Sequence, residues 1–263
     1  MSSTITVLLV VVLAIPLLMY VMQDSLLFHP QPLSEAQRIS IRHRFPGVEE
    51  IVLQAEDARL HAWHVKGQPS KPLVIYFGGN AEEVSWMIED ARTRAPGVGW
   101  LLVSYRGYGG SQGALSEATI TADALRWYDH AVKGLAATRV IAFGRSLGSG
   151  AAVSLAAQRK ISSVVLVTPY DSLVEVAKHH YPYLPVRLML RHPFDSVDRA
   201  PKLAMPLLCI AASRDEVIPM ERARRLFDAW GGPKQWVELP GADHNGTDGM
   251  PAFWQAITAF LQQ

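Results

Sequence analysis

The chain has 263 residues, a formal net charge of +1 and one cysteine. This length suits a single α/β domain with a large core, and the balanced charge excludes the basic surface expected of a nucleic-acid-binding protein. A lone cysteine excludes an intramolecular disulfide, and because no metal-ligand spacing is present we expect neither a metal nor an organic cofactor.

The first feature along the chain is an apolar segment. Residues 5–22 are almost wholly apolar, and Asp24 is the first charged side chain. This is about the length of a membrane-spanning helix, in which Pro16 would be tolerated. We therefore expect residues 1–24 to be an uncleaved, single-pass anchor, with a bacterial inner membrane as the location. A cleaved signal peptide is the alternative, although its basic start and small-residue cleavage site are absent. No Lys or Arg precedes the segment, so the positive-inside rule favours neither side of the membrane.

Residues 25–263 predict one α/β domain. Residues 24–47 contain three prolines and are expected to be irregular. Residues 50–53 and 60–65 flank a turn and predict a hairpin. Continuous apolar runs, typical of buried parallel strands, then alternate with helical patterns. The predicted strands are residues 73–77, 99–104, 139–143, 163–167, 207–211 and 235–239, and the predicted helices are residues 82–94, 117–133, 149–157 and 252–261. This alternation predicts an eight-stranded, mostly parallel sheet with helices on both faces.

The regular alternation is interrupted once. Residues 168–204 contain five prolines, several aromatic side chains and short helical pieces. We expect this segment to be a small lid-like insertion over the site. Cys209 follows within an apolar run, where a buried structural thiol is expected rather than a nucleophile.

A candidate nucleophile lies between a predicted strand and a predicted helix. Gly144-Arg145-Ser146-Leu147-Gly148 has the form G-x-S-x-G, the pattern of a nucleophile elbow. The turn is tight, so glycines flank it, and Ser146 is placed at a helix N-terminus that favours negative charge. A glycine- and serine-rich turn without chemistry is the alternative.

An acyl-transfer site also needs two backbone N–H groups that point at one oxyanion. One is supplied by the residue after the nucleophile, which here is Leu147. The other comes from the loop after the third strand, where Gly78-Gly79-Asn80-Ala81 follows residues 73–77 and makes Asn80 the candidate. A purely connecting turn is the alternative for this loop.

The last two predicted strands supply an acid and a base in the order Ser, Asp, His. Asp215 follows the seventh strand and His244 follows the eighth. Both should therefore emerge at the same edge of the sheet as Ser146, where His244 would accept the serine proton and Asp215 would orient the imidazole. Glu216 and Asp243 are weaker candidates for the acid. The remaining candidate bases lie in the predicted lid, and these are His179, His180 and His192.

Four motifs together resemble one known family. They are Gly144-Arg145-Ser146-Leu147-Gly148-Ser149, Tyr105-Arg106-Gly107-Tyr108-Gly109, Gly79-Asn80-Ala81 and Leu239-Pro240-Gly241-Ala242-Asp243-His244-Asn245. The combination, with the N-terminal apolar segment, resembles the Bem46-type α/β-hydrolases, which include the eukaryotic abhydrolase-domain proteins 13 and 17. The resemblance covers nearly the whole chain and implies the α/β-hydrolase fold, with Ser146, Asp215 and His244 as nucleophile, acid and base.

Two differences from the family pattern matter. Many relatives have His-Gly where this chain has Gly78-Gly79, which removes a side chain that often braces the loop. The members numbered 17 resemble protein depalmitoylases through a cysteine-rich N-terminus, which this chain lacks.

We therefore predict a membrane-anchored serine hydrolase that cleaves an ester or thioester of a small-molecule or lipid-like acyl substrate. A serine peptidase or amidase is one alternative, since the same triad cleaves amides. A non-catalytic membrane scaffold that keeps the hydrolase fold is another, but such a protein would not need all three triad residues. The sequence favours no particular oligomeric state.

Overall fold

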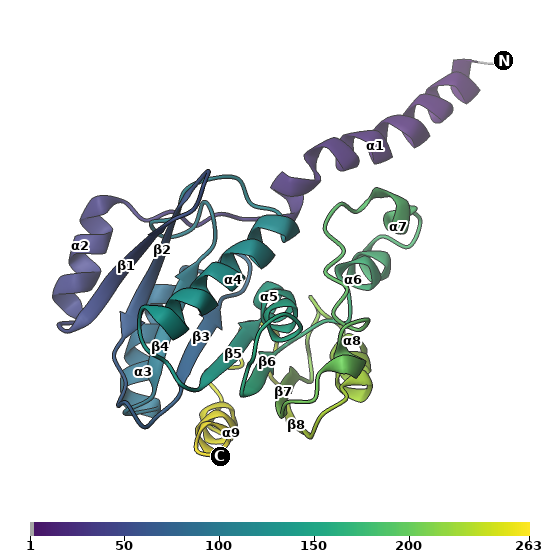
Figure 1. The fold of residues 1–263 in the computed structure, drawn as a ribbon. Helices are drawn as coiled ribbons and strands as arrows, with labels where there is room; N and C mark the ends of the chain where they lie inside the picture. The colour runs from purple at the N-terminus through teal and green to yellow at the C-terminus, as the bar shows by residue number, and fades with distance from the viewer. Residues whose placement is uncertain (1–2) are drawn as a thin grey trace.

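A computed structural model describes residues 3–263 of the protein, and it describes side chains from residue 14 onward (Figure 1). Eight strands form one sheet in the order β1-β2-β4-β3-β5-β6-β7-β8. The strands are β1 Val48–Gln54, β2 Arg59–Val65, β3 Leu73–Phe77, β4 Gly99–Ser104, β5 Val140–Arg145, β6 Ser163–Val167, β7 Leu207–Ala212 and β8 Lys234–Leu239. β2 pairs antiparallel with β1 and β4, and every other pairing in the sheet is parallel. The predicted eight-stranded, mostly parallel sheet is confirmed.

Helices cover both faces of this sheet. The helical elements are α1 Ser3–Leu27, α2 Glu35–Arg44, η1 Val84–Trp86, α3 Met87–Arg94, α4 Glu117–Lys133, α5 Leu147–Ala156, α6 Leu173–His180, α7 Val186–Met189, η2 Ala200–Lys202, α8 Met220–Ala229 and α9 Pro251–Leu261. Buried side chains of α4, α5 and α8 join one apolar cluster, and those of α3 and α9 join another. These clusters are the two cores of a three-layer α/β domain. The helix predicted over residues 82–94 is divided into η1 and α3.

One prediction was wrong. Residues 24–47 were expected to be irregular, but they contain α2. The Ser34 side chain accepts a hydrogen bond from the Gln37 N–H, and Gln37 accepts one from the Ser34 N–H in return. Arg38 and Arg42 pair with Glu50 on β1. The helix buries none of its residues, so it lacks the apolar periodicity by which helices are recognised.

Helix α1 extends away from the body of the sheet (Figure 1). Among the residues that the structure describes, none of the helices is both long enough and apolar enough to cross a membrane. Much of the predicted anchor, residues 1–24, lies outside the part of the chain whose side chains are described. The anchor therefore stays a prediction.

The C-terminal end of α1 is fixed to the predicted insertion. α6, α7 and η2 all lie within residues 168–204, as expected of short helical pieces. The Asp24 carboxylate lies 3.0 Å from the Arg191 guanidinium and 2.9 Å from His192 Nε2. The Gln23 side chain accepts a hydrogen bond from the Arg191 N–H at 2.7 Å and donates one to the Met189 carbonyl at 3.1 Å. These contacts hold the last turns of α1 beside α7 (Figure 1).

Two buried residues outside the site have structural roles. Cys209 is fully buried in β7, where burial raises the pKa of its thiol, as expected of an unreactive core cysteine. Arg106 donates hydrogen bonds to Asp123 at 2.8 and 3.1 Å and to Asp57 at 2.7 Å. Arg106 therefore holds its glycine-rich loop against α4 and the β1–β2 turn.

Candidate active site

The backbone turns sharply at Ser146. β5 ends at Arg145 and α5 begins at Leu147, so that Ser146 is the single residue between strand and helix. Its φ of 50° and ψ of −116° lie in a sparsely populated region, at a cost of about 1–3 kcal/mol. A Cβ on Gly148 would lie 2.1 Å from the Phe77 carbonyl oxygen, and one on Gly144 would lie 2.3 Å from the Gly148 carbonyl oxygen. Only glycine fits at these two positions, which explains the spacing of the motif.

The structure brings Ser146, His244 and Asp215 together. His244 Nε2 lies 2.9 Å from Ser146 Oγ, and His244 Nδ1 lies 2.7 Å from Asp215 Oδ2. The three residues follow β5, β8 and β7, whose carboxyl ends meet at one edge of the parallel sheet. The His244 side chain is 10% exposed, so it is shielded from water on most sides. These contacts are the ones that a serine nucleophile, a base and an orienting carboxylate require.

The loop after β7 holds the Asp215 carboxylate. Its Oδ1 accepts hydrogen bonds from the Val217 N–H at 2.9 Å and the Ile218 N–H at 2.7 Å, which leaves Oδ2 for His244. The Asp215 side chain is 2% exposed, whereas Glu216 is exposed to solvent. Two backbone donors and one imidazole therefore hold the carboxylate in a single orientation.

Three of the other candidate acids and bases contact other partners. Asp243 accepts hydrogen bonds from the Asn245 and Gly246 N–H groups within its own turn. His180 contacts the Val217 carbonyl, and His192 contacts Asp24. Among the residues whose contacts are described, Asp215 is thus the carboxylate in contact with His244.

The loop at residues 78–81 lies beside the elbow. A Cβ on Gly79 would lie 3.6 Å from Ser146 Cβ. The Gly79 N–H donates to Glu82, and the Ala81 N–H donates to the Asn80 side chain. The Asn80 N–H takes part in none of the hydrogen bonds formed by the described residues. Leu147 is the first residue of α5, where a backbone N–H has no acceptor within the helix. Neither predicted donor thus has an acceptor among the hydrogen bonds of the described residues.

A carboxylate that the sequence reasoning missed braces this loop. Glu82 Oε2 accepts the Gly79 N–H at 2.6 Å, and Glu82 Oε1 accepts from the Tyr76 hydroxyl at 2.6 Å and from Trp86 Nε1 at 3.0 Å. Burial and the negative charge of Glu82 raise the pKa of Tyr76, so the phenol stays protonated and donates. The Tyr105 hydroxyl adds a bond to the Gly78 carbonyl at 2.7 Å. Together these hydrogen bonds brace the loop that follows β3.

Arg145 connects the elbow with the His244 loop. Its guanidinium donates to the Asn245 carbonyl at 3.0 Å, lies 3.5 Å from the Asp248 carboxylate and stacks over the Trp86 ring. Because Arg145 and Asn245 each adjoin a triad residue, this contact fixes the spacing of the two loops. Among the described residues, no group of three or more His, Cys, Asp or Glu side chains could hold a metal ion.

Known proteins resemble this chain in sequence and in fold. The family described as serine hydrolase matches residues 115–263. A protein of Mycobacterium tuberculosis is 36% identical over 228 residues, which cover 83% of this chain and 80% of that protein. The chain belongs to the serine hydrolase family.

Two further relatives and one solved structure narrow the assignment. The bem46 protein of Schizosaccharomyces pombe is 27% identical and the match covers 74% of this chain and 68% of that protein. The lysophosphatidylserine lipase ABHD12 of Danio rerio is 28% identical, with 76% of this chain and 57% of that protein covered. The structure of Est1E from Butyrivibrio proteoclasticus superposes with a TM-score of 0.67 at 17% identity, covering 81% and 97% of the two chains. The protein is thus a Bem46-type serine hydrolase with the α/β-hydrolase fold, as the motifs predicted.

Proposed function

We propose that the protein is a membrane-anchored serine hydrolase that cleaves an acyl ester or thioester through an acyl-enzyme on Ser146. The observation that carries this proposal is the position of His244, which lies within hydrogen-bond distance of Ser146 Oγ on one side and Asp215 on the other. A serine hydroxyl becomes a nucleophile at neutral pH only when a neutral imidazole accepts its proton.

The proposed reaction has two halves. Ser146 Oγ attacks the acyl carbonyl while His244 Nε2 takes the hydroxyl proton, and Asp215 stabilises the imidazolium that forms. The carbonyl oxygen becomes an oxyanion that accepts hydrogen bonds from the Asn80 and Leu147 N–H groups. His244 then gives the proton to the departing alcohol or thiol. In the second half a water molecule, deprotonated by His244, releases the acid and restores Ser146.

The relatives and the exposed surface of α1 support the proposed substrate class. The relative from Danio rerio is a lysophosphatidylserine lipase by name. Its similarity to this chain supports an acyl ester of a lipid-like molecule as the substrate. Exposed apolar side chains on the described part of α1 support attachment to a bilayer, where such substrates reside. They include Ile15, Leu17, Leu18 and Val21.

Two experiments test the proposal. Ser146→Ala should lower kcat on p-nitrophenyl butyrate by on the order of 10⁵–10⁶, because the triad acts as a unit. Ser154→Ala, on the same helix but bonded to Thr121, should leave kcat unchanged. Retained activity in Ser146→Ala would exclude Ser146 as the nucleophile.

The anchor is tested separately. The full-length protein should stay in the membrane pellet after alkaline carbonate, which removes peripheral proteins but not a spanning helix. N-terminal sequencing of the native protein should show that residues 5–22 are retained. A mature chain that begins after residue 22 would mean a cleaved signal peptide instead.

A further inference from the structure

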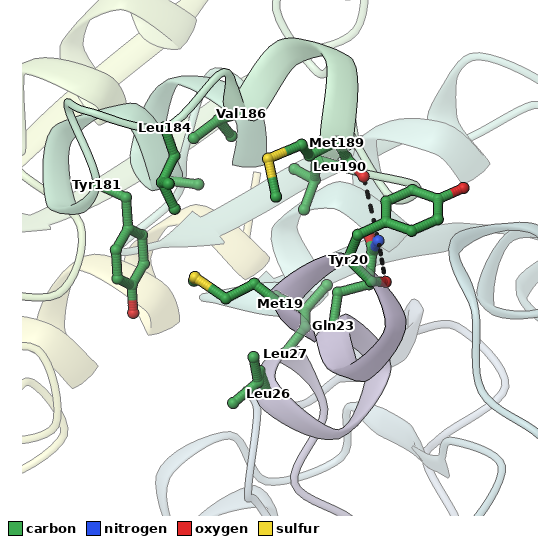
Figure 2. A pocket seen from close by; sticks show the side chains of 11 residues that line it. Met19, Tyr20, Gln23, Leu26, Leu27, Tyr181, Leu184, Val186, Met189 and Leu190 are labelled. Atoms are coloured by element: carbon green, nitrogen blue, oxygen red, sulfur yellow. Dashed lines mark hydrogen bonds between the residues drawn. The ribbon is translucent and has the colours of Figure 1, made fainter. Parts of the chain in front are cut away.

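A cavity of about 150 Å³ lies between the end of α1 and the α6–α7 segment. Its walls include Gln23, Leu26 and Leu27 from α1, and Ala177, Tyr181 and Leu184 from the insertion. Figure 2 shows side chains of α1 on one side and those of the insertion on the other, facing each other across the space. Two segments far apart in the sequence thus build one apolar pocket.

The side-chain amide of Gln23 in the pocket wall already has hydrogen-bond partners within the protein. Gln23 Nε2 donates to the Tyr20 carbonyl at 2.9 Å and to the Met189 carbonyl at 3.1 Å (Figure 2). Gln23 Oε1 accepts from the Arg191 N–H. A polar ligand would lose its hydrogen bonds to water and gain few here. An alkyl chain loses nothing polar and gains from the removal of apolar surface from water.

The pocket adjoins the loop that would hold the substrate carbonyl. Leu27 lines the pocket, and its carbonyl accepts a hydrogen bond from Asn80 Nδ2 at 2.6 Å. On the other side of this loop, Gly79 packs against Ser146. One loop therefore contacts both the candidate nucleophile and the pocket wall.

The mouth of the pocket is open. Leu26 is 53% exposed and Tyr181 is 51% exposed, so apolar surface at the rim faces solvent. These two residues mark the side of the pocket from which an acyl chain would enter.

We propose that this pocket binds the acyl chain of the substrate, a single alkyl chain whose carbonyl is held at Ser146. The inference rests on the proposed function and adds the chain-length preference. An apolar cavity of about 150 Å³ accommodates a group of roughly six carbons, the size of benzene. The first carbons after the carbonyl must pass the loop at residues 78–81, which lies between Ser146 and the pocket. Medium and long acyl chains therefore reach the pocket, and acetyl groups do not. Each methylene that enters should raise kcat/KM about fourfold.

The test compares p-nitrophenyl acetate, octanoate and decanoate with full-length protein in CHAPS, a steroid detergent without an alkyl chain that could compete. For the wild type, kcat/KM should rise from acetate to octanoate. Ala177→Phe places a ring in the pocket and should lower the octanoate-to-acetate ratio of kcat/KM more than tenfold. Leu188→Phe adds the same ring on α7 at a residue that is 87% exposed and does not line the pocket, so the ratio should not change.

A second variant covers the case in which Ala177→Phe fails to fold. Leu184→Ala enlarges the pocket and should move the preferred ester from octanoate towards decanoate. An unchanged chain-length profile in a folded Ala177→Phe or Leu184→Ala protein would overturn the inference while the esterase remains. A wild type that hydrolyses none of the three esters would instead contradict the proposed function itself.

Discussion

The side chain of Asn80 donates a hydrogen bond to the carbonyl of Leu27 at 2.6 Å, joining the end of the N-terminal helix to the loop beside Ser146. The same side chain accepts from the Tyr108 hydroxyl at 2.9 Å and from the His29 N–H at 3.0 Å. Asn80 is thus held from three directions, and its own N–H, the proposed oxyanion donor, is held with it.

Loss of this side chain should therefore impair catalysis although the backbone donor remains. We expect Asn80→Ala to lower kcat by on the order of 10- to 100-fold, with a smaller effect on KM. A displacement of the backbone donor by about 1 Å is enough to lower the catalytic rate by this factor. Tyr108→Phe removes one of the hydrogen bonds to this side chain and should act in the same direction but less strongly. Steady-state kinetics on p-nitrophenyl butyrate measure both. A kcat within twofold of wild type in Asn80→Ala would show that the side chain does not position the donor.

The hydrogen bonds by which Glu82 braces the loop at residues 78–81 lead to a second prediction. Glu82→Ala leaves the Gly79 N–H and the buried Tyr76 hydroxyl without their acceptor, which should cost about 1–3 kcal/mol of stability. It should also lower kcat, since the loop shifts. Thermal unfolding and kinetics check the two effects. Glu89→Ala, at an exposed residue of α3, is the matched control and should change neither.

The acid can be distinguished from its neighbour in sequence. Asp215→Asn should lower kcat by roughly 10⁴, because the amide favours the wrong imidazole tautomer. Glu216→Gln should cost little, since that side chain is exposed and the structure places Asp215 against His244. A large loss of kcat in Glu216→Gln with little loss in Asp215→Asn would identify Glu216 as the acid instead.

Much of this architecture could be predicted from the sequence because buried parallel strands are continuous apolar runs. Leu73–Phe77 is buried throughout, and so is Leu207–Ala212. Parallel strands deliver the residues that follow them to one edge, so the order of Ser146, Asp215 and His244 indicated their proximity before any coordinates. Helix α2 was missed because it has no apolar face, although the Ser34 and Gln37 spacing of a capping box was present.

The support around the site could not be predicted in the same way. The Asn80–Leu27 bond joins residues 53 positions apart, and no periodicity marks a contact between a side chain and a distant carbonyl. Glu82 lay at the start of a predicted helix, where an acidic residue is ordinary. Its contact with Gly79 depends on the tertiary position of the loop.

Stability should also depend on pH through a buried histidine outside the site. Burial lowers the pKa of His61 to about 4, against an ordinary value of 6.5, and nearby Glu50 only partly offsets this. As pH falls from 6.5 to about 4, the unfolded chain binds a proton that the folded protein does not, so stability falls through this window. His61→Gln should flatten the fall of Tm between pH 7 and about 4.5, whereas His43→Gln, at an exposed residue, should not. If Tm falls equally steeply with pH in the wild type, His61→Gln and His43→Gln, His61 is not the source of the pH dependence.

Covalent labelling tests the central claim most directly. A fluorophosphonate probe reacts with a serine that an adjacent base has activated, and mass spectrometry identifies the modified peptide. The proposed mechanism predicts a single adduct on Ser146 in the full-length protein, lost in Ser146→Ala and strongly reduced in His244→Ala. Absence of labelling in the wild type, or an adduct on another serine that persists in Ser146→Ala, would contradict the account.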